Sequence, residues 1–134
     1  MSYLSGFRRG VCLWVLSFAL VSPAFGQKKW TLLLFLNGHN NLDAFGELNI
    51  NQLETIGSTA DIDIVVQYAS SRSETTKRYH IQKDADNSTI TSPIVEDLPR
   101  IDMGDKASLV EFVRWGSQKF PADHYFVDIW NHGN

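Results

Sequence analysis

The stretch WTLLLFLNG, from Trp30 to Gly38, decides the class of fold that this sequence predicts. Its apolar run continues to Leu36 without the regular polar alternation of a strand that has one face in water. Such continuous apolarity indicates a strand buried on both faces, as in a parallel sheet covered by helices. Two later stretches are also strand candidates, DIDIVVQYA at Asp61–Ala69 and HYFVDIW at His124–Trp130. We therefore expect three main strands, rich in apolar and β-branched residues.

The segment between the first two strands predicts a helix. Its apolar residues fall on a roughly helical period: Leu42, Phe45, Leu53 and Ile56. Asn40 or Asn41 can cap the start of this helix, and Gly57 can close it. Gly46, in its middle, is unfavourable in a helix and weakens the prediction there.

A polar stretch follows the second strand and leads to a second helix. The polar stretch holds a predicted strand at Lys77–Gln82 and a turn at Asp84–Ser88, which indicate an exposed hairpin or edge segment with His80 facing solvent. Asp105 is a good N-cap for the second helix, and Pro121 ends it. Its apolar stripe recurs at i, i+3, i+4, i+7 and i+11: Leu109, Phe112, Val113, Gly116 and Phe120.

The order of these elements predicts an α/β layered fold with a mostly parallel sheet, because strand, helix, strand, hairpin, helix and strand follow one another. In such sheets, ligands gather at the carboxyl ends of the strands. His39 lies just beyond the first strand and His132 just beyond the third. Both are expected at that edge of the sheet, and His132 is therefore a candidate site residue.

The pair His132-Gly133 has the chemistry of an active site. Histidine is the side chain best suited to act as a general base near neutral pH. A following glycine lets the backbone approach a substrate and direct an N–H at a developing oxyanion. By itself, a His-Gly pair at a strand end is more often an ordinary turn. A zinc site built from His39, His124 and His132 is a further alternative, although no paired ligand spacing supports it.

Residues 1–26 have the layout of a secretory signal peptide. Arg8 and Arg9 precede an apolar run at Val11–Val21, and the small residues Ala24 and Gly26 precede the expected cleavage before Gln27. The apolar run is short for a membrane span, and a retained signal anchor is the alternative. We expect export, by secretion or to the periplasm, and a mature domain over residues 27–134.

Charge and cysteine usage restrict the partners and the chemistry of the mature chain. Removing Arg8 and Arg9 lowers the number of Lys and Arg residues from 12 to 10 against 15 Asp and Glu, for a net charge of about −5. An acidic chain without a basic cluster predicts no nucleic-acid partner and, after signal cleavage, no membrane partner. The only cysteine is Cys12, inside the expected signal peptide, so the mature chain has no thiol and no disulfide.

Beyond these separate features, the chain resembles the clostripain family of cysteine endopeptidases, whose fold is similar to that of the caspases. The resemblance covers nearly the whole mature chain. It rests on four motifs in the expected order: Asn37-Gly38 with Asn40-Asn41-Leu42-Asp43, Met103-Gly104-Asp105 with Leu109 and Phe112, Phe120-Pro121-Ala122-Asp123-His124-Tyr125, and Trp130-Asn131-His132-Gly133. It implies a caspase-like three-layer sandwich with a mostly parallel sheet, incomplete at the C-terminus.

The resemblance also implies a reaction and a site. Members of the family use a Cys-His dyad to cut peptides or proteins after Arg or Lys, and an acidic group in the pocket would pair with that basic residue. By correspondence, His132 would be the catalytic histidine and the N–H of Gly133 would help to form the oxyanion hole. The nucleophilic cysteine would follow the next strand, outside these residues. A C-terminal chain that completes the site is one candidate partner. No cofactor is required, although a bound calcium ion is sometimes associated with the family.

The sequence departs from the family pattern at three points. The mature chain has no cysteine, and a base without a nucleophile forms no acyl-enzyme, so the chain is expected to be inactive alone. His39 stands where an acidic residue is expected, with a cap or loop role. Asp128 lies in an apolar strand, where an unpaired buried carboxylate costs several kcal/mol. It could face an outer surface, pair with a basic residue of a missing half, or mark a decaying gene.

Two readings from other classes stay open beside the peptidase. The chain could be a non-catalytic exported α/β module that binds a partner through the same sheet edge, or the remnant of a truncated gene. A complementary chain that bears a cysteine would favour the peptidase. Stable monomeric folding of residues 27–134 alone would favour the binding module, because a third strand without its neighbour would leave an uncovered sheet edge.

Overall fold

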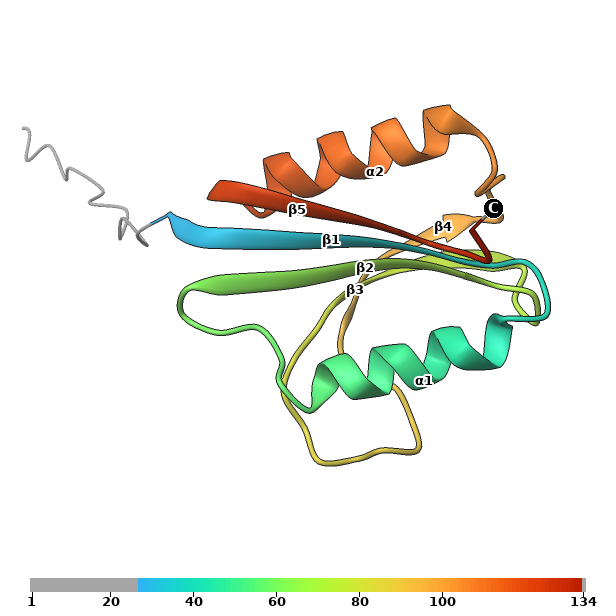
Figure 1. The fold of residues 1–134 in the computed structure, drawn as a ribbon, viewed down its shortest axis with the longest axis horizontal. Helices are drawn as coiled ribbons and strands as arrows, with labels where there is room; N and C mark the ends of the chain where they lie inside the picture. Colours follow the sequence, from blue (N-terminus) through green and yellow to red (C-terminus); the bar gives the residue numbers. More distant parts are fainter. Residues whose placement is uncertain (1–26, 134) are drawn as a thin grey trace, which may run out of the picture.

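The computed structural model describes residues 27–133, which form a five-stranded sheet with one helix on each face (Figure 1). The elements follow in chain order: β1 (Lys28–Gly38), α1 (Asp43–Glu54), β2 (Ile62–Ser70), β3 (Thr75–His80), β4 (Ile94–Pro99), α2 (Lys106–Lys119) and β5 (Ala122–Trp130). In space the strands lie in the order β4-β3-β2-β1-β5. The expected signal peptide, with Cys12, lies outside the described residues.

The sheet combines a parallel part with an antiparallel flank, and this arrangement confirms the predicted α/β class. β1 pairs in parallel with both β2 and β5, whereas β3 pairs antiparallel with β2 and β4. Parallel neighbours end at the same edge of a sheet, so β1, β2 and β5 bring their carboxyl ends together. Within residues 27–133, neither helix is long and apolar enough to span a membrane.

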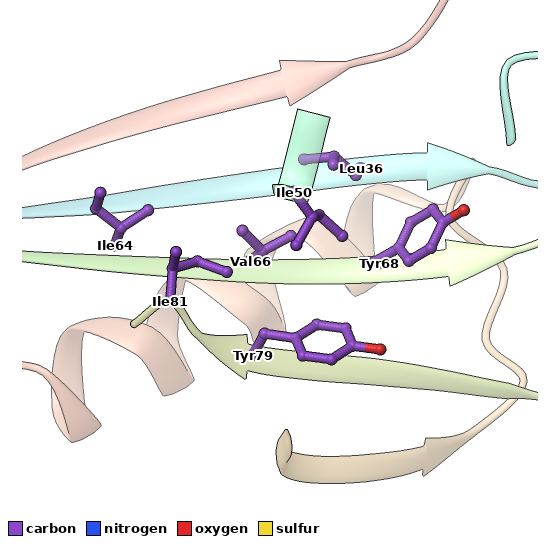
Figure 2. Packing of buried hydrophobic residues seen from close by; sticks show 7 residues of the cluster. All are labelled: Leu36, Ile50, Ile64, Val66, Tyr68, Tyr79 and Ile81. Atoms are coloured by element: carbon purple, nitrogen blue, oxygen red, sulfur yellow. The ribbon is translucent and has the colours of Figure 1, made fainter. Parts of the chain in front are cut away.

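β1 lies inside the sheet, as its continuous apolar run predicts. Leu33 and Phe35 pack in the apolar cluster on the α2 side, and Leu36 packs in the cluster on the α1 side. The α1-side cluster, shown in Figure 2, consists of Leu36, Ile50, Ile64, Val66, Tyr68, Tyr79 and Ile81. The α2-side cluster consists of Leu33, Phe35, Val65, Ala69, Met103 and Phe112. Two helix layers around one sheet therefore give the three-layer arrangement.

The apolar period that predicted α1 matches the buried face of that helix only in part, because Leu53 packs against the α1-side cluster whereas other residues of the period do not. Phe45 and Ile56 are exposed, with 54% and 65% of their surface accessible, whereas Ile50 is fully buried. The helix instead approaches the sheet at Gly46, where an added Cβ would lie 2.6 Å from Cε2 of Tyr68. This close contact between the helix backbone and a tyrosine ring sets the rotation of α1 and explains the glycine in its middle.

The predicted caps of α1 were wrong at one end and right at the other. The N-cap is Leu42, which makes no side-chain cap hydrogen bond, although Oδ1 of Asn40 accepts the Leu42 N–H at 2.8 Å. Asn41 takes no part in capping. After the helix, Gly57 adopts φ +68° and donates its N–H to Leu53 O at 2.8 Å, so it closes the helix as predicted.

The predicted hairpin is more buried than its polar sequence suggests. β3 is an interior strand, and the sheet edge is β4, which was not predicted as a separate element. His80 was expected to face solvent, but its Nε2 lies 2.8 Å from Oδ1 of the buried Asp63. Arg78 is buried as well, and its guanidinium donates hydrogen bonds to Gln67 and Glu96 at 2.8 and 2.5 Å, which compensate for the lost contact with water. Paired polar groups, rather than apolar ones, therefore allow this strand to be covered.

Helix α2 and strand β5 confirm their sequence predictions. Oδ1 of Asp105 accepts the Ala107 N–H at 2.9 Å, which is the expected N-cap bond. Phe112 is fully buried, and Gly116 lies so close to the sheet that an added Cβ would sit 2.5 Å from Leu33 Cδ2. This close packing places the end of α2, and therefore the start of β5, directly beside β1.

Candidate active site

The carboxyl ends of β1 and β5 bring two loops together at one edge of the sheet. β5 runs beside β1 in parallel, with Trp130 opposite Leu36. The chain that leaves β1 turns there into α1, and the described chain ends at the same side (Figure 1). His132 therefore lies at the predicted edge, next to the loop between β1 and α1.

The imidazole of His132 forms one hydrogen bond in the described part of the chain. Its Nε2 lies 2.7 Å from Oδ1 of Asn41, and the backbone N–H of His132 donates to Oδ1 of Asn131 at 2.8 Å. A carboxamide oxygen only accepts hydrogen bonds, so this contact requires the proton on Nε2. In the neutral ring, Nδ1 is then unprotonated. The side chain is exposed, so this nitrogen can accept a proton from an approaching group.

Gly133 follows with a backbone conformation that favours glycine. Its φ is +71°, in the left-handed region, while an added Cβ would meet no atom within 4 Å. The requirement at this position therefore comes from the backbone and not from crowding. The residue is exposed, and its N–H is available for a role in binding an oxyanion.

A second side-chain bridge joins the same two loops one residue earlier. Nδ2 of Asn40 donates to Oδ1 of Asn131 at 3.0 Å and to the carbonyl of Asn37 at 3.1 Å. Together with the Asn41–His132 contact, this bridge fixes the loop after β1 against the loop after β5. From the sequence, Asn40 or Asn41 was assigned only to a helix cap, and neither they nor Asn131 were recognised as site residues. The repeated asparagines at two strand ends were the available signal.

Asp43 anchors the loop that carries these asparagines. Its Oδ1 accepts the Tyr68 hydroxyl at 2.5 Å, and its Oδ2 accepts Nε of Arg72 at 2.8 Å and the hydroxyls of Ser70 and Ser71 at 3.1 and 2.9 Å. Burial alone would raise the pKa of Asp43, but the hydrogen bonds, chiefly from Tyr68 and Arg72, hold that pKa well below its ordinary value. The carboxylate therefore stays ionised and ties the start of α1 to the end of β2.

His39 lies on the same loop but is not brought to His132. Its backbone N–H donates to Oδ1 of Asn37 at 3.1 Å, and its Nε2 is buried without a hydrogen-bond partner in the described residues. Burial, and then the charge of Arg100, lower the pKa of His39 despite the opposing charges of Asp102 and Asp43. This environment favours a neutral ring, as suits a loop residue.

The alternative metal site is not formed. His124 stands opposite Trp30 near the start of β5, far along the strand from His132. The rings of His124 and Trp30 are in tilted contact, with 4.8 Å between their centroids and 38° between their planes. Among residues 27–133, no three or more His, Cys, Asp or Glu side chains are grouped so that they could hold a metal ion. Within residues 27–133 the zinc alternative is therefore not formed, and no group of side chains is shown that would hold a calcium ion.

β5, at one edge of the sheet, exposes apolar side chains on both of its faces, because successive side chains of a strand point to opposite faces. Phe126, Val127 and Ile129 are 53%, 40% and 61% exposed. Asp128 is half-buried in a groove of about 360 Å³ between α1 and β5, where Leu34 and Trp130 are among its neighbours. Within the described residues, Asp128 has no hydrogen bond or ion pair. The side chain of Asp128 therefore lines this groove and is not fully exposed on an outer surface.

Comparisons with known proteins agree with this geometry. A family profile described as the clostripain family matches residues 34–134. Among solved structures, a cysteine protease from B. fragilis is similar with a TM-score of 0.68 and 16% identity, over 79% of this chain and 90% of that chain. A clostripain from Bacteroides thetaiotaomicron, solved with the peptide inhibitor BTN-VLTK-AOMK, has a TM-score of 0.66 and 14% identity, over 81% of this chain and 94% of that chain.

A third solved structure differs in how much of it is matched. It is a secreted C11 cysteine protease from Bacteroides thetaiotaomicron, solved with an irreversible peptide inhibitor, with a TM-score of 0.63 and 21% identity. The match covers 80% of this chain but only 30% of that chain. A comparison with curated protein sequences gives no match.

Proposed function

Because this chain belongs to the clostripain family of cysteine peptidases, we propose that it supplies the histidine-bearing part of an exported endopeptidase that cleaves after Arg or Lys. The observation that carries the proposal is the exposed His132, whose Nε2 is bound to Asn41 at 2.7 Å at the carboxyl edge of the sheet. That contact leaves Nδ1 as the free base. Gly133, with φ +71°, follows it directly.

In the proposed reaction, Nδ1 of His132 takes the proton from a cysteine thiol, and the thiolate attacks the carbonyl carbon of the scissile peptide bond. The N–H of Gly133 helps to stabilise the oxyanion that forms. The imidazolium of His132 then donates its proton to the leaving amine, and an acyl-enzyme remains. Water, deprotonated by the same nitrogen, releases the acid and restores the thiol. The cysteine comes from outside residues 27–134.

The exposed apolar surface of β5 supports a neighbouring segment that brings this cysteine. In the described sheet, β5 has one edge without a neighbouring strand, and it exposes Phe126, Val127 and Ile129. The free backbone groups of such an edge favour pairing with another strand. We propose that a further strand pairs with β5 and places the nucleophile beside His132. The partner strand belongs either to the continuation of this chain or to a second chain. Residues 27–134 would be inactive without it.

The share of each solved chain that the match covers supports both sources of the partner strand, a continuation of this chain and a second chain. The chain spans 94% of the matched chain in one B. thetaiotaomicron structure and 30% of it in the other. A region of this length thus forms nearly a whole chain in one of these peptidases and the smaller part of a chain in the other.

Two further parts of the proposal concern specificity and export. The inhibitor in the B. thetaiotaomicron clostripain structure, BTN-VLTK-AOMK, contains the peptide VLTK, whose last residue is basic. This supports cleavage after Lys or Arg by a pocket whose acidic group comes from outside residues 27–134. One of the similar peptidases is described as secreted. Together with the layout of residues 1–26, this supports export and cleavage of a signal peptide before Gln27.

The experiment compares residues 27–134 with the complete product of the gene on ester substrates of Arg, Lys, Leu and Asp. We expect the complete product to hydrolyse the Arg and Lys esters and to lose this activity after alkylation of its thiols, while residues 27–134 show no turnover. Activity in residues 27–134 that survives alkylation would contradict the Cys-His mechanism. A preference of the complete product for Leu or Asp esters would contradict the proposed specificity alone.

The exposed apolar side chains of β5 are also the observation that favours a non-catalytic binding module. Such a module would fold as a stable monomer from residues 27–134 and would need no cysteine. Analytical ultracentrifugation of this segment distinguishes the readings, because the peptidase part is expected to associate or precipitate through its uncovered strand. The absence of any stable product in cells would instead indicate the remnant of a truncated gene.

A further inference from the structure

The orientation of His132 depends on a single side-chain partner in the described part of the chain. The ring is exposed and bonds only Oδ1 of Asn41, at 2.7 Å. No charged residue among 27–133 forms an ion pair with it. An exposed imidazole without this bond would sample several rotamers and both neutral tautomers. A base that must meet a thiol at hydrogen-bond distance would then be correctly placed only part of the time.

Asn41 is itself held in place before it meets the histidine. The preceding residue, Asn40, donates to Asn131 at 3.0 Å and to the Asn37 carbonyl at 3.1 Å, and its own oxygen accepts the Leu42 N–H at 2.8 Å. Two residues further on, the buried Asp43 fixes the start of α1. The side chain of Asn41 therefore extends from a loop that is restrained on both sides, which makes it a preorganised acceptor.

The chemical character of the partner also matters. An asparagine oxygen accepts the Nε2–H without adding a negative charge beside the ring. A carboxylate at this position would favour the imidazolium, which cannot take a proton from a thiol. A neutral acceptor thus fixes the tautomer that leaves Nδ1 unprotonated.

We propose that Asn41 is a positioning residue, which holds the Nε2–H of His132 so that Nδ1 faces the incoming nucleophile. This inference rests on the proposed peptidase function. It adds a residue that acts through the histidine and touches neither the substrate nor the cysteine. The Asn40–Asn131 pair supports this role by joining the two loops one residue earlier.

The test uses the complete gene product and the variants Asn41→Ala and Asn41→Asp. For Asn41→Ala we expect kcat to fall by about 10- to 100-fold, because the base is misplaced, with KM changed by less than about twofold. For Asn41→Asp we expect kcat to be largely retained while the acidic limb of the kcat/KM profile moves up by about one pH unit. Asn87, an exposed residue between β3 and β4, is the matched control, and Asn87→Ala should leave both parameters unchanged.

An NMR titration of His132 in the same protein separates this inference from the peptidase proposal, because it needs no activity. If Asn41 contacts Nε2, Asn41→Asp raises the titration midpoint of His132 by about one pH unit, while Asn87→Asp leaves it unmoved. An unmoved midpoint in Asn41→Asp, or a kcat within about twofold of the wild type in Asn41→Ala, overturns the inference. A shifted midpoint in a protein without peptidase activity upholds the contact and overturns only the peptidase function.

Discussion

Replacing His132 with alanine is expected to lower kcat/KM of the complete enzyme by about 10³- to 10⁴-fold. The variant loses the group that takes the proton from the thiol and returns it to the leaving amine. The loss should appear mainly in kcat, because an exposed histidine at the edge of the sheet contributes little to substrate binding. Steady-state kinetics on Arg and Lys esters measures both parameters.

His124→Ala is the control for this substitution. His124 is an exposed histidine inside β5, where its ring contacts that of Trp30 near the end of the strand that is far from His132. Its replacement should change kcat/KM by less than about threefold, because it only loses a surface contact. If His124→Ala and His132→Ala reduced activity equally, the loss would reflect damage to β5 and not the removal of a base.

Replacing Asp43 with asparagine is expected to have the largest effect on stability, a loss of about 3 kcal/mol in the free energy of unfolding at pH 7. The buried carboxylate accepts hydrogen bonds from Tyr68 and Arg72 at 2.5 and 2.8 Å. An amide cannot satisfy all of these donors, and the Tyr68 hydroxyl is buried with it. Chemical denaturation monitored by fluorescence measures the difference. Asp61→Asn is the control, because Asp61 forms only an exposed ion pair with Lys29 and should change stability by less than about 1 kcal/mol.

The same variant predicts a pH dependence with a definite sign. The pKa of Asp43 is held below its ordinary value in the folded chain, so its contribution to stability is fully present above the unfolded-state pKa of about 3.9. The contribution is lost as pH falls below that value toward the folded-state pKa. The stability difference between wild type and Asp43→Asn should therefore narrow below about pH 4. A difference that stays constant from pH 7 to pH 3 would contradict the assigned contacts.

The strongly patterned elements of this fold could be predicted from the sequence. β1 shows its burial in a continuous apolar run, and α2 shows both its cap at Asp105 and its stripe through Phe112 and Gly116. In these elements the local pattern and the tertiary packing agree, because the apolar residues are the ones that the fold buries. The α/β class and the parallel pairing of the three main strands follow from the alternation of strands and helices along the chain.

The elements that were predicted poorly are those whose position depends on polar contacts. α1 turns Phe45 to solvent because its buried side carries Gly46, against Tyr68, and Glu54, whose Oε1 accepts backbone N–H groups from Thr91 and Ser92. The spacing of apolar residues cannot predict which side of a helix faces the sheet when that side is held by a glycine and by carboxylates. β4 was missed for a related reason, since half of its residues are polar or proline.

The candidate site shows the same division. The position of His132 at the edge of the sheet follows from the order of strands and helices along the chain, which can be predicted from the sequence. The contact with Asn41 joins residues 91 positions apart, and no local pattern encodes such a pair. The asparagines therefore read as turn and cap residues in the sequence, and only the parallel pairing of β1 with β5 gives them a common role.

The peptidase assignment is tested most directly by treating the complete gene product with a peptide inhibitor that ends in Lys. The modified residue is then located by mass spectrometry. We expect labelling of one cysteine, on the strand that pairs with β5, and loss of labelling in His132→Ala. Labelling that is equally fast without His132, or a product in which no cysteine is modified, would contradict the assignment of this chain as the histidine-bearing part of a cysteine peptidase.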